Sequence, residues 1–491
     1  MIAIIFGVII AASIAVAFIG RRGVDDTTPL GTLIAGRSLP AWLIFFLAVG
    51  EIYSIGTMLG FPGGIYAKGA SYGIWFIGYI LMGYIFGYFL APLVWRAGKA
   101  YGAVTVPDVM YGHYHSRLLE KLSAATFVLA LVPWAIFQFI GLQAVLSELG
   151  LPLSRMEVIV GTAVIAFLYV FASGVRSTAL VAIVKDALMF FGIVLAGIAV
   201  VVAAKGIHGV FAAAETKPGL GAVTGGALIF AMSTIFVQSI QFYLTLPAQF
   251  LFSAKSETSI KKSVVWMPLY MLMYPLLVFV AYYGVSHAPK LQRADHVFLV
   301  VVRDLAPPWI VGLVVAGAGL AALIVLAGNS LMFAGVFSRN LVPSMREAKT
   351  SGSLNLVMAG FLVLTATLST LASSIMLSFL TLALALTTQL VPAWFGVMFF
   401  RKLRAGALSI GMIVGCIIVA VFYFTGQSVG NINSGLIALV VNFAVAAFLS
   451  AFIKTGAPKY EPVGMRGREI LAGPSLQAAS YAVPQGQARH H

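Results

Sequence analysis

Long apolar runs recur along this chain of 491 residues, and they constrain its fold more than any other feature. Each crossing of a membrane's hydrocarbon core needs about 20 apolar residues in a helix. The chain is 61% hydrophobic and only 9% charged, whereas soluble proteins carry about 25% charged residues. A transmembrane barrel would show short segments of alternating polarity instead. We therefore expect an all-α polytopic membrane protein.

Marking these runs gives thirteen predicted membrane-spanning helices. Their ranges are 2–20, 41–65, 73–96, 120–148, 155–174, 178–204, 226–252, 264–287, 308–337, 355–373, 376–399, 405–425 and 432–453. No basic residue precedes the first run and Arg21-Arg22 follow it, which favours a membrane anchor over a cleaved signal peptide. After about residue 455 the chain is polar, and we expect a disordered tail there.

The positive charges are distributed unevenly between the loops. The net charge of +15 would suit a nucleic-acid partner, but most Lys and Arg residues fall in alternate loops, on one side of the membrane. The seven on the other side are Lys68, Arg155, Lys205, Lys217, Lys290, Arg293 and Arg303. The positive-inside rule then places the N-terminus outside and the C-terminus in the cytoplasm, across the cytoplasmic (inner) membrane. The charge is explained by topology, and no nucleic acid is expected to bind.

Two of the predicted spans are interrupted. The stretch LAVGEIYSIGTMLGFPGG (47–64) holds five glycines, Pro62 and one acid, Glu51. The stretch ALIFAMSTIFVQSIQFYLTLPAQF (227–250) holds Pro247 and several Ser, Thr and Gln residues. Broken backbone in a bilayer is tolerated where it faces protein or a wet cavity, so both stretches are expected to line a central site. The alternative is that such glycines only allow close helix packing, as we expect for GYIFG (83–87).

Interrupted spans at corresponding positions indicate a transporter built from two inverted repeats. The two spans are five apart, and an odd number of helices in each repeat gives the repeats opposite orientations. We therefore predict five parts. They are an N-terminal extra helix with its loop (1–40), a first repeat (41–204), a second repeat (226–400), two C-terminal helices (401–454) and a cytoplasmic tail (455–491).

Six motifs give the chain a resemblance to a known family. They are AGRSLPAW (35–42), GFPGGIYAKG (60–69), TVPDVMYGHY (105–114), SGVRSTALVAIVKD (173–186), FSAKSETSIKKS (252–263) and FSRNL (337–341). In this order they resemble the sodium/solute symporters, which have a LeuT-type fold. A closer similarity to the monocarboxylate permease branch lies in Gly50-Glu51-Ile52-Tyr53, VPWAIFQFIGLQAVL (132–146) and Lys185-Asp186. That branch tends to carry Tyr-Pro-His in the seventh span, where this chain has Thr245-Leu246-Pro247-Ala248.

The resemblance also implies where the family's sodium site would lie. Sodium-coupled members hold the ion with backbone carbonyls of the second and ninth spans and with two adjacent hydroxyls of the ninth. The corresponding positions here are Gly50, Tyr53, Ala321, Ile324 and Val325. Ile and Val supply no oxygen, whereas a hard cation needs several oxygen ligands. We therefore predict a degenerate sodium site that holds no metal.

Three ionisable residues lie inside predicted spans, namely Glu51, Lys185 and Asp186. A carboxyl group shielded from water holds a proton more readily, and proton relays in transporters use such residues. Glu51 is the leading candidate for the proton carrier. The alternative is a static ion pair between Glu51 and Lys185. Lys185 and Asp186 lie nearer the cytoplasmic end of their span. For these two residues we favour a solvated or structural ion pair over a role in coupling.

A small carboxylate is bound well by hydrogen-bond donors and by an exposed helix N-terminus. The predicted substrate-binding residues are Gly50, Tyr53, Ser54, Trp134, Gln138, Gln241 and Gln389. Trp134, Gln138 and Gly141 share one face of a helix. Structural alternatives remain: interhelical hydrogen bonds for Gln138, Gln143 and Gln389, and packing for Tyr53 and Trp134.

Together these inferences predict a secondary active transporter of a short-chain monocarboxylate, such as pyruvate, lactate or propionate, with the proton as coupling ion. Its partners are that substrate, the proton and the lipid bilayer, with no cofactor. One alternative is a sodium-coupled symporter for an amino acid or sugar. Another is a transporter-like sensor, for which the tail is too short to hold a signalling domain. An enzyme is not expected, because the spans hold no nucleophile–base pair, metal cluster or phosphate loop.

Overall fold

The computed structural model describes residues 1–21, 29–172, 175–216, 219–342, 351–371, 376–453 and 455–465. Within these ranges the chain is helical and has no β-strand beyond one isolated bridge between Leu39 and Ala254. The α-helices are α1 (Ile2–Arg21), α2 (Pro29–Ile34), α3 (Ala41–Ile52), α4 (Phe61–Lys68), α5 (Ala70–Ala100), α6 (Val106–Tyr114), α7 (Arg117–Ser147), α8 (Arg155–Ala172), α9 (Val175–Ala203), α10 (Ile207–Thr216), α11 (Gly225–Gln241), α12 (Leu246–Leu251), α13 (Glu257–Trp266), α14 (Tyr274–His287), α15 (Val297–Leu305), α16 (Pro308–Val336), α18 (Ser351–Leu371), α19 (Met376–Thr388), α20 (Val391–Met398), α21 (Ala405–Thr425) and α22 (Ser434–Phe452). Short segments of 3-10 or π geometry are η1 (Ala35–Arg37), η2 (Gly56–Gly60), η3 (Met267–Met273), η4 (Ala294–His296) and η5 (Phe337–Leu341).

Eleven helices in the described ranges are long and apolar enough to cross a membrane. This confirms the expected all-α polytopic class. The predicted number of spans was thirteen, and the two that differ are the second and the fifth. The second is divided between α3 and α4, and the apolar part of α8 is the shorter stretch Met156–Phe171. The length and composition of the described helices therefore support eleven membrane spans and do not establish the predicted thirteen.

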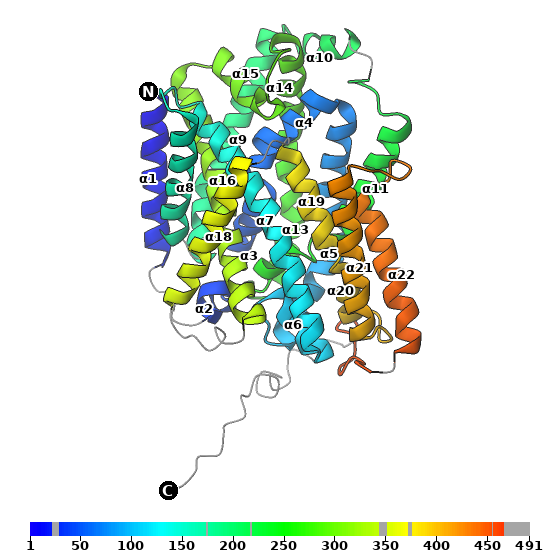
Figure 1. Ribbon diagram of the computed structural model, residues 1–491. Helices are drawn as coiled ribbons and strands as arrows, with labels where there is room; N and C mark the ends of the chain where they lie inside the picture. The colour runs from blue at the N-terminus through cyan, green and yellow to red at the C-terminus, as the bar shows by residue number, and fades with distance from the viewer. Residues whose placement is uncertain are drawn as a thin grey trace.

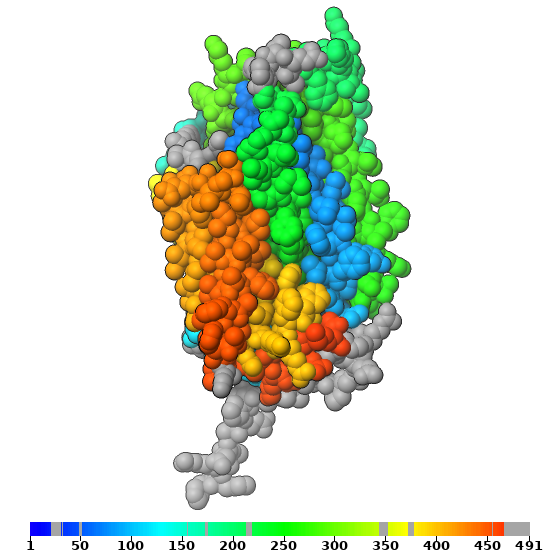
Figure 2. Space-filling model, turned by 90° about the vertical axis from the view of Figure 1, so that its right-hand side faces the viewer, coloured from blue at the N-terminus to red at the C-terminus, as the bar shows by residue number. Residues whose placement is uncertain are grey.

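The long helices run side by side as one bundle (Figure 1). α1 begins at the end of the bundle where α10, α14 and α15 lie, and α22 ends at the opposite end, near α6. α22 and α21 cover part of one face, with α11 and α5 beside them (Figure 2). α16 occupies the centre, because it packs against α1, α7, α9 and α18 and almost all of its side chains are buried.

Two glycines bring α5 close to the end of α11. A Cβ atom added at Gly83 would lie 2.7 Å from the ring of Phe242, and one added at Gly87 would lie 2.1 Å from the ring of Tyr243. Both distances are far below van der Waals contact, so neither position has room for a side chain. The motif at 83–87 therefore allows close helix packing, as its spacing predicts.

A buried polar cluster joins α6, α7 and η5 at the end of the bundle where α6 lies. Asp108 accepts hydrogen bonds from Arg339 Nε at 2.7 Å and from Asn340 Nδ2 at 2.9 Å. The same Asn340 amide donates to Glu120, and its oxygen accepts from the Thr105 hydroxyl at 2.8 Å. This Asp108 cluster links the motifs at 105–114 and 337–341, which are more than 200 residues apart in the chain.

The Asp108 carboxylate is held in its charged form. Burial by itself would raise the pKa of Asp108, but the Arg339 guanidinium and hydrogen bonds from Asn340 and the Val104 backbone outweigh burial, so the pKa lies below its usual value. A lowered pKa means that the stabilisation is complete above the unfolded-state pKa of about 3.9 and is lost as the pH falls through the folded-state value.

Replacement of Gly87 tests the close approach of α5. We expect Gly87→Ala to lower the melting temperature of the detergent-purified protein by several degrees, because the new methyl group must displace the Tyr243 ring. Gly360→Ala is the matched control, since a Cβ atom there meets nothing within 4 Å and alanine favours a helix by about 1 kcal/mol. Equal effects of the two substitutions would contradict this account.

Removal of the Asp108 charge tests the polar cluster. Asp108→Asn removes the buried carboxylate that pairs with the Arg339 guanidinium, and we expect a loss of about 3 kcal/mol of stability at neutral pH. Glu461→Gln serves as control, because the pair of Glu461 with Arg401 is exposed and such pairs contribute about 0–1 kcal/mol. Thermal unfolding in detergent measures both. The difference between wild type and Asp108→Asn should shrink as the pH is lowered below about 4.

Candidate functional site

The first break in the membrane helices lies between α3 and η2. Tyr53 and Ser54 leave the helical path, and helical geometry resumes at Ile55. The Ser54 hydroxyl accepts a hydrogen bond from the Gly56 N–H at 3.1 Å, and the Ser54 carbonyl accepts one from the Thr57 N–H at 2.9 Å. A Cβ atom at Gly56 would lie 2.6 Å from Phe137 of α7, so glycine is needed for the broken segment to reach that helix.

The second break lies between α11 and α12, in the span that was predicted to match the first. The Thr245 hydroxyl donates to Gln241 Oε1 at 2.6 Å, and the Thr387 hydroxyl of α19 donates to the same oxygen at 3.2 Å. The Gln241 amide nitrogen donates to Gln238 Oε1 at 2.7 Å. These bonds connect the break to α19 and occupy the polar atoms of Gln241.

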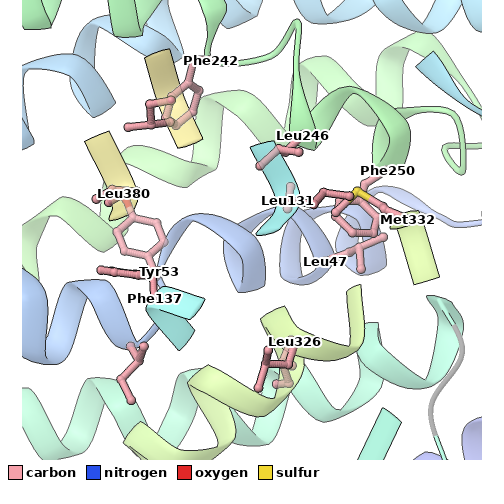
Figure 3. Packing of buried hydrophobic residues seen from close by; sticks show 14 of the residues in the cluster. Leu47, Tyr53, Leu131, Phe137, Phe242, Leu246, Phe250, Leu326, Met332 and Leu380 are labelled. Carbon is pink, nitrogen blue, oxygen red and sulfur yellow. The ribbon is translucent and has the colours of Figure 1, made fainter. Parts of the chain in front are cut away.

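A small internal cavity lies where the two breaks meet. Its volume is about 40 Å³, which is room for at least one water-sized group. Its lining residues are Ile52, Tyr79, Trp134, Gln241, Phe242, Thr245, Leu246, Pro247 and Leu384. Figure 3 shows buried apolar residues that pack around both breaks, including Tyr53, Phe137, Phe242 and Leu246. Two predicted substrate-binding residues, Trp134 and Gln241, therefore line one cavity.

A second cavity, of about 530 Å³, is lined by residues of α4, α5, α11, α19 and α21. Trp75 lines this larger cavity and stacks on Tyr79 of the smaller one, with ring centroids 5.9 Å apart. Trp75 also contacts Phe230 of α11 edge to face. The two stacked rings of α5 therefore each line one of the two cavities.

Unpaired hydrogen-bonding groups lie on the predicted face of α7. The Trp134 Nε1 atom and both amide atoms of Gln138 are buried and have no hydrogen-bond partner among the described residues. Gly141 lies on the same face and packs closely against Ile55. A Cβ atom added at Gly141 would lie 2.8 Å from the Ile55 side chain. An unpaired buried polar group costs about 1–3 kcal/mol. The face of α7 against the first break thus offers donors that a ligand can satisfy.

Other predicted substrate-binding residues have partners within the protein. The Tyr53 hydroxyl lies 2.7 Å from that of Tyr84, and the Gln389 oxygen accepts from Asn442 of α22 at 3.1 Å. Ser54 bonds within the break, and Gln143 donates to Ser369 of α18 at 3.0 Å. These contacts match the packing alternative for Tyr53 and the interhelical alternatives for Gln389 and Gln143. Gly50 lies in α3.

The positions corresponding to the family's sodium site lack the hydroxyl pair, and a lysine from another helix bonds to one of them. Ala321, Ile324 and Val325 are buried in α16, and the next hydroxyl along this helix, Ser330, bonds to the Leu326 carbonyl at 2.7 Å. Lys185 Nζ donates to the Tyr53 carbonyl at 2.9 Å. No group of acidic, His or Cys side chains that would hold a metal occurs in the described ranges.

Of the three predicted coupling residues, the structure describes the side chains of Lys185 and Asp186 but not that of Glu51. Lys185 and Asp186 form an ion pair with side-chain exposures of 0% and 2%, so they do not occupy a solvated rim. Glu51 lies in α3, but its side chain is outside the described part of the structure, and so is its suggested pair with Lys185.

Sequence reasoning missed several polar residues near the site. Thr387 and Tyr79 contact or line the cavity region, and the buried Asn329 amide has no partner among the described residues. Thr387 and Asn329 carried a signal, since each is a polar residue within an apolar run. Tyr79 carried none, because tyrosine is common in such runs.

Comparison with known proteins identifies the family. The model of the sodium:solute symporter family matches residues 33–415. The chain belongs to this family. This symporter-family chain is 29% identical over 460 residues to a monocarboxylate transport permease protein of Rhizobium johnstonii, with 87% of this chain and 91% of the relative covered. An uncharacterized symporter of Bacillus subtilis is 27% identical, with 91% and 96% covered.

A solved structure supports the fold of this symporter-family chain. A Na⁺-coupled sialic acid symporter superimposes with a TM-score of 0.73 at 14% sequence identity, covering 94% of this chain and 98% of the other. The fold is therefore LeuT-like. The resemblance to the family, and to its monocarboxylate permeases in particular, is confirmed, and the chain is a transporter and not an enzyme.

Substitution on α7 tests whether the unpaired groups bind substrate. We expect Gln138→Leu to lower the kcat/KM of solute uptake into proteoliposomes about tenfold or more, because a hydrogen bond to a charged ligand is lost. Gln143→Leu is a matched control on the same helix, since Gln143 bonds to Ser369, and it should change uptake by less than about threefold. Equal losses would assign Gln138 to structure.

Proposed function

We propose that this protein is a secondary active transporter that moves a short-chain monocarboxylate by alternating access, coupled to protons and independent of sodium. The observation that carries the proposal is the cavity between the two helix breaks, which Trp134 with its unpaired indole N–H lines. The unpaired Gln138 amide lies four residues further along the same face of α7. Transporters of this type bind substrate near the middle of the membrane, where discontinuous helices of the two repeats meet.

The chemistry of the cavity suits a small anion. Neutral donors and exposed backbone at a helix break stabilise a carboxylate without a full positive charge beside it. The apolar side chains of Ile52, Leu246 and Leu384 complete the lining and suit a short hydrocarbon part. The relative described as a monocarboxylate transport permease supports the same class of substrate.

The missing hydroxyl ligands support the proposed independence from sodium. No Ser or Thr occurs between residues 321 and 328, and α16 presents hydrocarbon at positions 324 and 325. Without the two hydroxyls, Na⁺ would give up its water for fewer oxygen ligands than the family's sodium site supplies. The proposed proton carrier is Glu51, which is adjacent to the first break in sequence, with Lys185 and Asp186 as further candidates.

The proposal includes the finer architecture that the sequence predicts. It consists of thirteen membrane helices, with repeats at 41–204 and 226–400, an additional helix before them and two after them. The N-terminus would lie outside and the C-terminus in the cytoplasm. The positions of the breaks in α3–η2 and α11–α12 support the repeats, and the opposite positions of α1's start and α22's end in Figure 1 fit the orientation.

Uptake by purified protein in proteoliposomes tests the function. Labelled pyruvate, lactate and propionate are compared with amino acids and sugars, while Na⁺ and pH gradients are imposed separately. We expect an inward proton gradient to drive uptake of the acids and a Na⁺ gradient alone to have no effect. Uptake of an amino acid or sugar driven by Na⁺ would instead establish the sodium-coupled alternative.

Glu51→Gln tests the proton carrier in the same assay. The amide keeps the size of the side chain but takes up no proton, so we expect proton-driven uptake to fall about tenfold or more, while exchange of substrate at equal pH persists. Glu461→Gln is the matched control, because Glu461 is exposed near the chain's C-terminal end. Unchanged proton-driven uptake in Glu51→Gln would exclude Glu51 as the carrier.

A further inference from the structure

We propose that the ammonium group of Lys185 is a built-in cation that takes the place of the sodium ion at the first helix break. The proposal rests on the proposed function, because it explains how this protein transports without sodium. It gives Lys185 a defined role, that of a fixed charge that holds the broken backbone of the second span.

The position of the ammonium group is the first observation. Lys185 is fully buried in α9, and its Nζ atom donates to the Tyr53 carbonyl at 2.9 Å. Tyr53 follows the last residue of α3, where helix carbonyls lack intrahelical partners and the helix dipole is negative. The resemblance to sodium-coupled members places an ion-binding carbonyl at this same residue. A cation of the chain itself is therefore bound to it.

The opposite wall gives the second observation. α16 packs against both α3 and α9, and it is buried hydrocarbon at Ile324 and Val325. The two hydroxyls that would complete a sodium site are replaced by Ile324 and Val325, whose side chains supply no oxygen. Without these two hydroxyls, a free Na⁺ would have fewer oxygen ligands than the family's sodium site supplies, whereas a hard cation needs several.

The charges around Lys185 balance without an external ion. Asp186, the next residue of α9, forms an ion pair with the ammonium group. The Tyr270 phenol of η3 faces the Asp186 carboxylate. α16, which also packs against α9, is apolar from residue 321 to residue 328. Among the described side chains the site thus holds one cation, Lys185, and one anion, Asp186. A sodium ion bound beside Asp186 would give the same balance of charge.

The alternative is that Lys185 and Asp186 form a purely structural ion pair. A double variant distinguishes this alternative from the proposed role of Lys185 as a cation. If Lys185 and Asp186 only neutralise each other, then Lys185→Met with Asp186→Leu should fold and transport as wild type does, because apolar residues replace such pairs well. If the ammonium group acts as the cation of the break, the double variant should fold but exchange pyruvate at least about tenfold more slowly.

The decisive experiment is chemical rescue of Lys185→Ala. Self-exchange of labelled pyruvate is measured in proteoliposomes at equal pH on both sides, so that amines do not disturb a gradient. We expect exchange to fall about tenfold or more and to recover at least threefold with methylammonium, which replaces the deleted ammonium group. Tetramethylammonium should not rescue, because it lacks N–H donors and is too large. Lys402→Ala, at an exposed position, is the control and should exchange as wild type does.

Binding of Na⁺ to the wild type gives a readout that needs no substrate and no variant. We expect the melting temperature to be the same in Na⁺ and in choline at equal ionic strength. Stabilisation by Na⁺, full exchange by Lys185→Ala or by the double variant, or a folded Lys185→Ala that methylammonium does not rescue, would overturn the proposal. Failure of the proposed function has a different signature, in which the wild type takes up no acid while Na⁺ still leaves its melting temperature unchanged.

Discussion

The requirement that backbone polar groups find partners inside the membrane governs this structure. An unbroken helix satisfies the requirement by itself, but α3 and α11 both end in the middle of the bundle. At each break, side chains supply the missing partners. Ser54 and Lys185 do so at the first, and the Thr245 hydroxyl, which donates to the Gln241 carbonyl at 3.3 Å, does so at the second. The cavity lies at the point where these replacements allow two helices to stop.

The Lys185–Asp186 pair shows how costly such replacements are. Removing one partner from a buried ion pair costs about 3–5 kcal/mol, whereas replacing both by apolar groups is often neutral. A chain that needed only to fill this space could use apolar side chains, as it does at Ile324 and Val325 of the adjoining helix α16. Retaining the charge is explained if the Tyr53 carbonyl must be bound by a cation.

The sequence predicts the breaks better than it predicts the contacts that close them. Glycine, proline and clustered polar residues within apolar runs marked both breaks, and the spacing of Trp134, Gln138 and Gly141 placed them on one face of α7. The bond from Lys185 to Tyr53 joins residues 132 positions apart, and that from Asn442 to Gln389 joins α22 to the end of α19. Periodicity reports which face a residue occupies, but the partner on another helix depends on packing of the whole bundle.

The first break joins the cation and the cavity through adjacent residues. Ile52 lines the cavity, and the Tyr53 carbonyl binds Lys185. Because Ile52 and Tyr53 are adjacent in the chain, a shift of the carbonyl can displace Ile52, and a substrate that pushes on Ile52 can displace the carbonyl. Coupling of this kind is reciprocal, so the cation and the substrate change each other's binding by the same factor. In this geometry an ion and a substrate can be linked without touching, and a lysine fixed to the chain would keep one side of that link permanently occupied.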